Sequence, residues 1–424
     1  MEKNKLTDFI IIWNEDKAAL IDPINKVCLG VSNKIAENLE DKSVIKKIYP
    51  IWKQQVELQN EIVSQQHKIN TLYLMVTRKC NMNCDFCAIN ANQNMKLDQE
   101  IKIEDVRQKV IPFLKKYNPH KIIITGGEPL IKEKIQEIIA EIHHEMDSFI
   151  ILQSNGLNID NELLDGIANN VDEIDFSTKH MFQSIEKETE LKNHIKMVQA
   201  RGMEVVLSFI YDRENKEDLY KVIDIAAEYN TELLINIVAS IGRAKDNRQQ
   251  ILTEYEKMEM NLDVAQYIYL KNYIEKKLFS FMLKNIQVQN SCGAYGRVIA
   301  VFPEGHIYMC QCLEKNKFRI GNVLNDDVDK LENTLDILMD KEYIKKSFCV
   351  DAKEICKDCN YRYLCGGICP ASTEENDFEC YFRKKMIEFK LFCKNGENKK
   401  LLLEEYIKYL MDIKKDYTEK VQLN

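Results

Sequence analysis

The apolar positions between residues 70 and 285 follow two alternating patterns. Short runs made almost entirely of Ile, Val, Leu and Phe are typical of strands buried on both faces of a parallel sheet. Between the runs, apolar residues recur every three or four positions, which predicts amphipathic helices that cover such a sheet. Alternation of this kind produces right-handed βαβ units. The predicted strands are Leu72–Thr77, Lys121–Thr125, Phe149–Gln153, Glu173–Ser177, Glu204–Phe209 and Glu232–Ala239.

Six such units predict an α/β fold built as a partial, TIM-like (β/α)6 barrel. In barrels of parallel strands, the chemistry lies on the loops that follow the carboxyl ends of the strands. Those loops therefore hold the first candidates for a functional site. The helices predicted for the outer ring are Asp105–Tyr117, Lys132–His144, His194–Arg201 and Lys216–Tyr229, and a longer helical stretch, Leu252–Leu283, leads out of the barrel.

Residues 1–68 carry a different pattern, in which short apolar strands precede helical segments. Two runs joined by a polar turn predict a β-hairpin, and a third short run follows. Ser32 and Ser43 are candidate caps of two helices, the second with Pro50 as a point of interruption. A hairpin followed by helices resembles a winged-helix layout. The predicted strands are Phe9–Trp13, Lys17–Ile21 and Lys26–Gly30.

Composition narrows the classes of function. Of the 424 residues, 45% are hydrophobic and 30% are charged, as in ordinary globular proteins. The net charge of −8 disfavours a nucleic-acid partner, and no run approaches the ~20 apolar residues of a membrane span. The apolar core at the N-terminus is too short for a signal peptide. We therefore expect a cytoplasmic protein with reduced thiols, in which fourteen cysteines indicate metal ligation rather than disulfides.

Cys80, Cys84 and Cys87 lie at CxxxCxxC spacing directly after the first predicted barrel strand. Three thiols on one loop can hold three irons of a cubane [4Fe-4S] cluster and leave the fourth iron open. A zinc loop is the alternative, but zinc needs a fourth ligand and structural sites usually use paired CxxC knuckles. The spacing resembles the signature of the radical S-adenosylmethionine (SAM) enzymes. That resemblance implies that the open iron binds SAM, which one electron cleaves to a 5′-deoxyadenosyl radical.

Further residues at strand ends match SAM-binding positions of that family. Two glycines and a carboxylate after the second strand resemble its GGEP motif, in which the glycines allow close approach to a ligand and the carboxylate accepts from the SAM ammonium. Ser177 lacks the Asp-Gly that often follows it in the family, and Arg243 is equally suited to the SAM carboxylate, the substrate or a structural ion pair. The cofactor-binding candidates are Phe86, Gly126, Gly127, Glu128, Asn155, Ser177 and Arg243.

The cysteines between residues 286 and 394 follow a second pattern. Their spacing resembles the seven-cysteine SPASM extension of radical SAM enzymes, which implies two auxiliary [4Fe-4S] clusters and three clusters in all. A zinc ribbon remains the alternative for the CxxC pair. A hairpin with its turn at Gly305 is expected to bring Cys292 and Cys310 together. By position, the resemblance implies Cys356, Cys359, Cys365 and Cys380 as ligands of the outer cluster, and Cys292, Cys310 and Cys369 as ligands of the inner one.

The inner cluster is one protein ligand short under this assignment. Either Cys312 or Cys349 completes it, or the fourth iron stays open and binds a substrate thiol; the open iron is our preferred interpretation. Cys28 and Cys393 are expected to be ordinary packed thiols. Beyond the cysteines, Lys399–Lys414 predicts an amphipathic helix that packs on the barrel or, less favoured, docks a partner.

The resemblance implies an oxidoreductase of the radical SAM/SPASM class with a flavodoxin- or ferredoxin-type reductant. The leading region looks like the leader-recognition domains of ribosomal-peptide maturases, which bind a peptide as an added strand. It therefore implies a precursor peptide as partner and thioether or carbon–carbon cross-links as products. A DNA-binding winged helix and a structural cap are the alternatives for this region. The expected domains are 1–68 for leader recognition, 69–285 for the barrel, 286–394 for the auxiliary clusters and 395–424 for a C-terminal helix.

Two other functions remain open at this point. A formylglycine-forming anaerobic sulfatase maturase usually begins near its CxxxCxxC motif and has an Asp after the cysteine that matches Cys310. Here 79 residues precede Cys80, and Gln311 follows Cys310. Both departures disfavour that activity. A zinc-stabilised peptide-binding scaffold without catalysis is the alternative outside the enzymes.

Overall fold

The computed structural model describes residues 9–64, 69–95, 100–246, 250–371, 377–393 and 398–422. Its main element is a nine-stranded sheet in the order β12-β11-β10-β4-β5-β6-β7-β8-β9. The six central strands pair in parallel in chain order, so the predicted α/β class with a parallel sheet is confirmed. These strands are β4 (Thr71–Met75), β5 (Lys121–Thr125), β6 (Phe149–Ser154), β7 (Glu173–Ser177), β8 (Glu204–Tyr211) and β9 (Glu232–Ile237).

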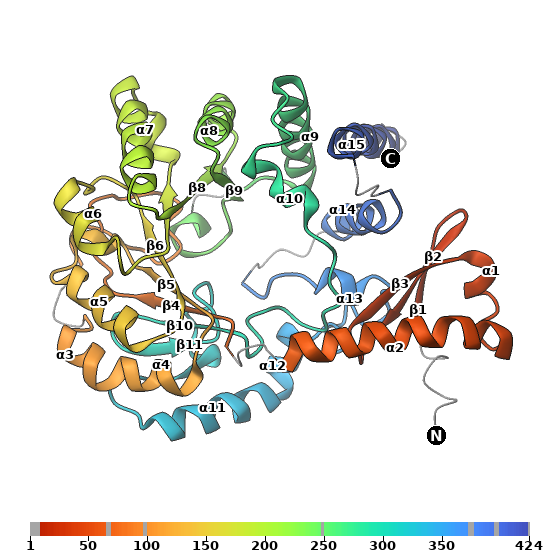
Figure 1. The fold of residues 1–424 in the computed structure, drawn as a ribbon, viewed down its shortest axis with the longest axis horizontal. Helices are drawn as coiled ribbons and strands as arrows, with labels where there is room; N and C mark the ends of the chain where they lie inside the picture. The colour runs from red at the N-terminus through yellow and green to blue at the C-terminus, as the bar shows by residue number, and fades with distance from the viewer. Residues whose placement is uncertain are drawn as a thin grey trace.

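Helices line the outer side of this curved sheet (Figure 1). Alternate strand residues, such as Ile122 and Ile124 of β5, are fully buried in the core that the helices share. The other residues of each strand face the inside of the curve, because side chains alternate along a strand. The helices are α3 (Ile103–Asp105), the π-helical turn η1 (Val106–Val110), α4 (Ile111–Tyr117), α5 (Ile135–Glu145), α6 (Asn161–Ile167), α7 (Ile185–Gln199), α8 (Lys216–Tyr229) and α9 (Glu254–Lys271).

Two predicted helices have different limits. α7 begins at Ile185, well before His194, because Ser184 caps it and its charged first turns hide the apolar period. The stretch 252–283 is not one helix. α9 ends where Asn272 adopts a left-handed conformation with φ of 57°, which stops a helix. The short segments η6 (Lys277–Phe279) and α10 (Ser280–Leu283) follow.

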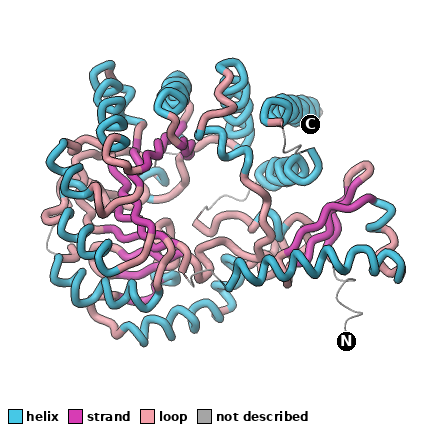
Figure 2. Tube along the Cα trace, viewed as in Figure 1, coloured by secondary structure: helices cyan, strands magenta, loops and turns pink. Residues whose placement is uncertain are grey.

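The cysteine-rich region continues the barrel sheet. β10 (Val298–Val301) pairs in parallel with β4, and the predicted hairpin then brings back β11 (His306–Tyr308) in antiparallel pairing. Gly305, with φ of 79°, forms the turn as expected. Figure 1 labels β10 and β11 beside β4, and Figure 2, in the same view, shows the strands of the sheet in magenta with the helices in cyan around them. The later elements are β12 (Arg319–Asn322), α11 (Val328–Asp340), α12 (Glu342–Phe348), α13 (Arg362–Cys365), α14 (Asp377–Glu388), η8 (Phe389–Cys393) and α15 (Lys399–Gln422), which packs along α9.

The leading region is a three-stranded antiparallel sheet with one long helix, at the right of Figure 1. Alternate residues of its central strand point to opposite layers. Leu20 packs with Trp52 of the long helix, whereas Ile21 packs with Val350 and Cys356 of the cysteine-rich region. Both faces of the sheet are therefore covered, and only its two edge strands can pair with a further strand. The elements are β1 (Ile10–Trp13), β2 (Lys17–Asp22), β3 (Val27–Ser32), α1 (Asn33–Ala36) and α2 (Lys42–Ser64).

Pro50 does not interrupt the helix, contrary to the expectation from sequence, because α2 runs through it. A proline inside a helix costs about 3 kcal/mol through its missing hydrogen bond and its ring. Ile48 and Trp52 flank it and are buried against the sheet, and large buried side chains contribute about 1.5–3 kcal/mol each. Trp52 also donates its indole N–H to Asp22 at 2.9 Å. Tertiary packing therefore maintains the helix. None of the described helices combines the length and apolar character needed to cross a membrane.

Candidate active site

A cavity of about 800 Å³ opens at the carboxyl ends of the six parallel strands. Its walls come from the loop after β4, from the ends of the following strands and from the turn after β11. All three cysteines of the CxxxCxxC motif line it, and so do all seven cofactor-binding candidates. The structure therefore brings together Cys80, Cys84, Cys87, Phe86, Gly126, Gly127, Glu128, Asn155, Ser177 and Arg243 around one space.

The cysteine loop directs backbone N–H groups at its sulfurs. Met82 N–H lies 3.4 Å from the sulfur of Cys80, and Ala91 N–H lies 3.3 Å from that of Cys87. Burial raises the pKa of Cys80 to about 11 and also raises the pKa of Cys84. Hydrogen bonds to sulfur favour the thiolate form, which is the form that ligates iron. The loop thus suits a metal centre that neutralises its sulfurs.

Three thiols on one loop beside a cavity form a donor set that fits a [4Fe-4S] cluster, in which cysteines ligate three irons and the fourth stays open. A structural zinc site would need a fourth protein ligand.

Arg243 holds this loop in place. Its guanidinium donates to the carbonyl oxygens of Cys84 at 2.8 Å and Ala91 at 2.9 Å, and to Asn83 Oδ1 at 2.7 Å. Its backbone N–H also donates to the carbonyl of Cys87 at 3.1 Å. The side chain is therefore a clasp on the cysteine loop, and its contact with SAM or the substrate stays a prediction.

The glycines of the GGEP motif allow close approach, but to the protein's own backbone. A Cβ on Gly127 would lie 2.0 Å from the carbonyl oxygen of Lys79, and a Cβ on Gly126 would lie 2.6 Å from that of Thr77. Gly127 N–H donates to Thr77 O at 2.8 Å. The expectation of close approach to a ligand is thus incomplete. These glycines first allow the loop after β5 to press against the chain that leads into the cysteines.

Glu128 has partners within the protein. Its carboxylate is 1% exposed and accepts from Ser154 Oγ at 2.8 Å, Asn155 N at 2.8 Å and Leu130 N at 3.0 Å. Burial raises its pKa, against the effect of these bonds. The carboxylate therefore joins the loops after β5 and β6, and its contact with the ammonium of SAM stays a prediction.

The other candidates lie at the rim of the cavity. Asn155 donates to Asn81 Oδ1 at 2.7 Å and so ties the loop after β6 to the cysteine loop. Lys179 lies with its ammonium 4.6 Å from the ring centroid of Phe86 and forms an ion pair with Asp212. Sequence reasoning did not single out Lys179 or Asp212. Their separation in sequence hides a contact that only the barrel creates.

His180 also lines the cavity and is buried. Burial lowers its pKa to about 4, so its imidazole is neutral at physiological pH. Its Nε2 has no hydrogen-bond partner among the described residues. The side chain is therefore a buried, neutral part of the cavity wall and not a surface histidine.

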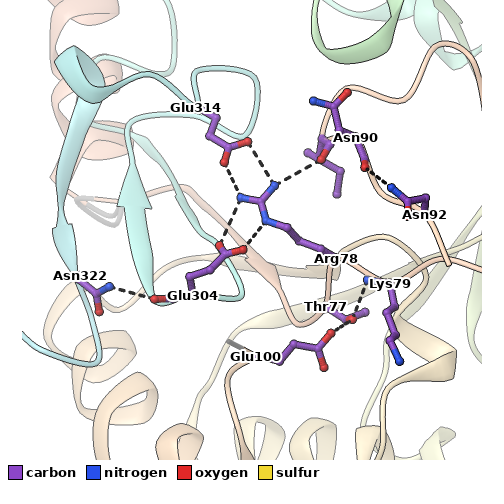
Figure 3. A network of polar contacts seen from close by, with 10 residues as sticks. Thr77, Arg78, Lys79, Asn90, Asn92, Glu100, Glu304, Glu314 and Asn322 are labelled. Atoms are coloured by element: carbon purple, nitrogen blue, oxygen red, sulfur yellow. Dashed lines mark hydrogen bonds and ion pairs between the residues drawn. The ribbon is translucent and has the colours of Figure 1, made fainter. Parts of the chain in front are cut away.

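Arg78 joins the barrel to the cysteine-rich region (Figure 3). It follows β4, and its guanidinium pairs with both Glu304, in the β10–β11 turn, and Glu314, just after Cys312. The same group lies 5.1 Å from the ring centroid of Phe302. The side chain is largely shielded from solvent, so both ion pairs are stronger than exposed ones. This clamp fixes the turn that carries Cys310 and Cys312 next to the cavity.

The thiols expected around the inner cluster lie close together. Burial raises the pKa of Cys292, and the nearby thiols of Cys369 and Cys310 raise it further. Cys312 shares a hydrogen bond with Cys310, which raises the pKa of Cys312, and it interacts with Cys369 and Cys292 as well. Cys349 instead shares a hydrogen bond with Tyr295, and its electrostatic neighbours are Asp351, Lys345 and Lys353. Of the two spare cysteines, Cys312 is the one in this group.

A second group of thiols lies beside the first. Cys356 interacts electrostatically with Cys359 and Cys365. Cys380 lies near the start of α14, which packs against the helix α13 that ends at Cys365. Lys353, 9% exposed, interacts with thiols of both groups, and its ammonium donates to the carbonyl of Ile368. A buried lysine between two sets of thiols was not expected from the sequence.

Comparison with known proteins matches part of this chain to a protein family. Residues 74–252 match the Radical SAM superfamily. A GTP 3′,8-cyclase of Clostridium perfringens (strain 13 / Type A) is 24% identical over 305 residues, covering 66% of this chain and 90% of the relative. The chain therefore carries a Radical SAM domain, which implies SAM and a [4Fe-4S] cluster as cofactors.

Solved structures resemble this fold over most of the chain. Streptococcus suis SuiB bound to S-adenosylmethionine superposes with a TM-score of 0.54 at 14% identity, covering 87% of this chain and 98% of SuiB. The structure titled anSMEcpe with bound AdoMet gives a TM-score of 0.58 at 17% identity, covering 77% and 98%. At these identities the likeness concerns the fold. The fold of most of this chain thus has counterparts among solved structures.

Proposed function

We propose that this protein is a radical SAM enzyme that cross-links a ribosomally made precursor peptide. When bound, the cluster and SAM supply a 5′-deoxyadenosyl radical by one-electron cleavage of the sulfonium. Cys80, Cys84 and Cys87 hold that cluster, and the backbone at Gly126 and Gly127, with Phe86, Asn155 and Ser177, forms the SAM-binding wall. The observation that carries the proposal is the convergence of all these residues on one cavity.

The charge of the cavity favours a peptide over a nucleoside triphosphate. Among the described residues that line it, six are acidic and two, Lys179 and Arg243, are basic. Lys179 is paired with Asp212, and the donors of Arg243 are directed at the cysteine loop. A triphosphate needs free cations. A GTP-cyclising activity like that named for the curated relatives is therefore disfavoured by this lining.

The leading sheet supports a peptide substrate. Its two faces are covered, so an added strand can join only an edge. A groove of about 710 Å³ runs beside β3, bounded by Gly30 and Val31 on one side and by Leu391 and Phe392 on the other. One of the similar structures, SuiB, was solved with precursor peptide SuiA bound. We propose the β3 edge as the leader-binding edge of this chain.

The cysteine-rich region is proposed to hold two auxiliary clusters that accept the electron released when the product forms. Cys356, Cys359, Cys365 and Cys380 are assigned to the outer one. Cys292, Cys310 and Cys369 are assigned to the inner one, with Cys312 as the fourth ligand because its thiol is part of that group. This replaces the open iron preferred from the sequence. Because Cys312 also lines the cavity, the inner cluster is adjacent to the substrate space.

Formylglycine formation is the second candidate, supported by the fold likeness to anSMEcpe. Against it, the residue after Cys310 is Gln311, whose side chain is a neutral amide, and it lines the cavity. A neutral amide cannot take a proton from a substrate thiol or hydroxyl. Cross-linking thus remains the better-supported chemistry.

The experiment uses anaerobic enzyme with reconstituted clusters, SAM, dithionite and each short peptide encoded beside the gene. We expect 5′-deoxyadenosine together with a peptide that has lost two hydrogens per cross-link by mass spectrometry. C84A should abolish both products, while C349S, which alters a thiol that bonds to Tyr295 and does not line the cavity, should form both. Oxidation of a serine to formylglycine also removes two hydrogens, so a peptide that carries an aldehyde, detected by its reaction with a hydrazide, would establish the formylglycine alternative. If no deoxyadenosine forms, the proposal that this protein is a radical SAM enzyme is wrong.

A further inference from the structure

Four neighbouring strands of the barrel sheet each carry a polar side chain on the inner face of the sheet. Side chains that alternate with the outer core residues point into the curve, and aliphatic residues such as Ile151, Val206 and Ile210 share this face with the polar ones. The polar residues all line the cavity. They are Gln153 of β6, Asp175 of β7, Ser208 of β8 and Asn236 of β9.

Asp175 is the residue of this set that lacks a full complement of partners. It is 5% exposed, Gln153 donates to its Oδ2 at 2.9 Å, and the neighbouring hydroxyl of Ser208 also favours its charged form. Its Oδ1 is buried and has no hydrogen-bond partner among the described residues. A buried carboxylate oxygen without a donor is costly, and such groups usually have a partner when the site is filled. Oδ1 therefore marks the place of a missing donor.

Among the described residues, the groups that interact with the carboxylate of Asp175 are the neutral side chains of Gln153 and Ser208, and no cation is directed at it. Of the two basic residues at the cavity, Lys179 pairs with Asp212 and lies over Phe86, and Arg243 is engaged with the cysteine loop. The neighbouring carboxylate on the same face, Glu173, can only repel a second negative charge. Burial meanwhile opposes the charged form of Asp175. A positive group from a ligand would supply a hydrogen bond to Oδ1 and would also compensate the buried negative charge of Asp175. A neutral donor would supply only the hydrogen bond and leave the buried charge uncompensated.

Asp175 lies deeper in the barrel than the proposed SAM-binding wall. Ser177, the proposed SAM contact, is the last residue of β7, and Asp175 precedes it by two residues on the same face. Two residues of a strand span about 6.6 Å. A ligand group that reaches Oδ1 thus lies one layer below the rim, farther inside the barrel than the cysteine loop.

We infer that Asp175, oriented by Gln153, is a specificity residue that binds a basic side chain, lysine or arginine, of the peptide substrate. This inference rests on the proposed function, since it names a feature of the same substrate. The modified segment of the peptide then carries a basic residue within one side-chain length of the carbon that loses hydrogen. Asp175 anchors this residue and fixes which carbon faces the radical.

The test compares D175N with wild type and with E173Q, a matched control on the same strand and face but outside the cavity lining. For D175N we expect the KM for the peptide to rise about tenfold to a hundredfold, the loss typical of a charged hydrogen bond. The Kd for SAM, measured by calorimetry, should stay unchanged. E173Q should keep both values. If the Kd for SAM rises in D175N, or if the KM does not change, the inference is wrong.

Substitutions in the peptide give a second test that needs no enzyme variant. Each lysine and arginine of the peptide is replaced by glutamine in turn. One replacement should raise the KM of wild-type enzyme by the same factor as D175N and have no further effect on D175N. If no single replacement does so, Asp175 does not bind a basic side chain. Failure of the proposed function is distinguished, because wild-type enzyme would then form no cross-linked peptide from any of these substrates.

Discussion

The guanidinium of Arg243, from the turn after β9, donates to the carbonyl oxygen of Cys84 at 2.8 Å. This contact joins two ends of the barrel that are far apart in sequence. It also keeps Gly242 against the same loop, where a Cβ would lie 2.2 Å from the carbonyl oxygen of Cys87. The last strand of the parallel sheet therefore positions the cysteines that follow the first.

Removal of this clasp should weaken the cysteine loop without unfolding the barrel. In R243Q, the charged donors to Cys84 and Ala91 are lost. Each hydrogen bond from a charged group contributes about 1.5–3 kcal/mol, so we expect deoxyadenosine formation to fall at least about tenfold. The SAM-induced change in the EPR spectrum should weaken in parallel. K245Q, an exposed change on the same turn, should match wild type; if it loses as much as R243Q, the clasp is not the cause.

Gly127 provides a steric test of the same loop. In G127A, the added methyl group would meet the Lys79 carbonyl at 2.0 Å, so one of the two segments must move. Overpacking of this kind typically costs about 1–3 kcal/mol. We expect a lower urea midpoint and a reduced iron content. G30A, where a Cβ meets nothing within 4 Å, is the control, and equal losses in both variants would contradict the argument.

The sequence predicted the parts of the site that are local. CxxxCxxC and GGEP each follow a strand, and parallel strands bring their carboxyl ends to one edge, so both motifs were expected at one cavity. The side-chain directions were not predictable in this way. Glu128 has a carboxylate that faces Ser154 and Asn155 of the next loop, and nothing in the motif indicates that direction.

The sequence pattern also could not predict which distant segments contact each other. Arg78 pairs with Glu304 and Glu314, more than two hundred residues away, and Lys353 lies among thiols of two separate groups. The helix that continues through Pro50 is another example, because the packing of Trp52 on the leading sheet outweighs the helix-breaking tendency of the proline. Local propensity and spacing placed the elements, whereas tertiary contacts decided which charged groups meet.

Glu173 should make stability depend on pH. Burial is the main cause that raises its pKa to about 7 from 4.5, so the folded protein keeps this proton longer than the unfolded chain. For an acid with a raised pKa, stability is full below the unfolded pKa and falls as the pH rises through the folded pKa. E173Q lacks this titration. We expect it to be more stable than wild type at pH 8, by about 1–2 kcal/mol after allowance for partial exposure.

The measurement is urea unfolding of the cluster-free protein at pH 5 and pH 8. At pH 5 the difference between E173Q and wild type should shrink towards zero. The same difference at both pH values would show that the carboxyl of Glu173 does not titrate in this range.

The two spare cysteines of the auxiliary region allow a direct comparison. If Cys312 completes the inner cluster, C312S should change the Mössbauer spectrum of one cubane by making one of its irons distinct. C349S should leave all spectra unchanged, because Cys349 bonds to Tyr295. A wild-type spectrum that already shows a distinct auxiliary iron, and that changes when the peptide is added, would instead establish an open iron with a substrate thiol bound.

Lys353 should set the reduction potential of the auxiliary clusters. Its buried ammonium interacts with Cys292, Cys369, Cys356 and Cys365, so it counters the negative charge of cysteinate ligands on both sides. Reduction adds one more negative charge, which a nearby cation stabilises in a region of low dielectric. In K353M the auxiliary potentials should therefore become more negative, and a shift of about 60 mV corresponds to a tenfold change in the reduction equilibrium.

EPR-monitored redox titration measures this shift separately from turnover. K357M removes an exposed ammonium one turn away that pairs with Glu354, and it should leave the potentials unchanged. If K353M and K357M give the same potentials, the charge of Lys353 has no influence on the clusters. If K353M alone shifts them, the slower electron acceptance should also appear as deoxyadenosine formed in excess over cross-linked peptide.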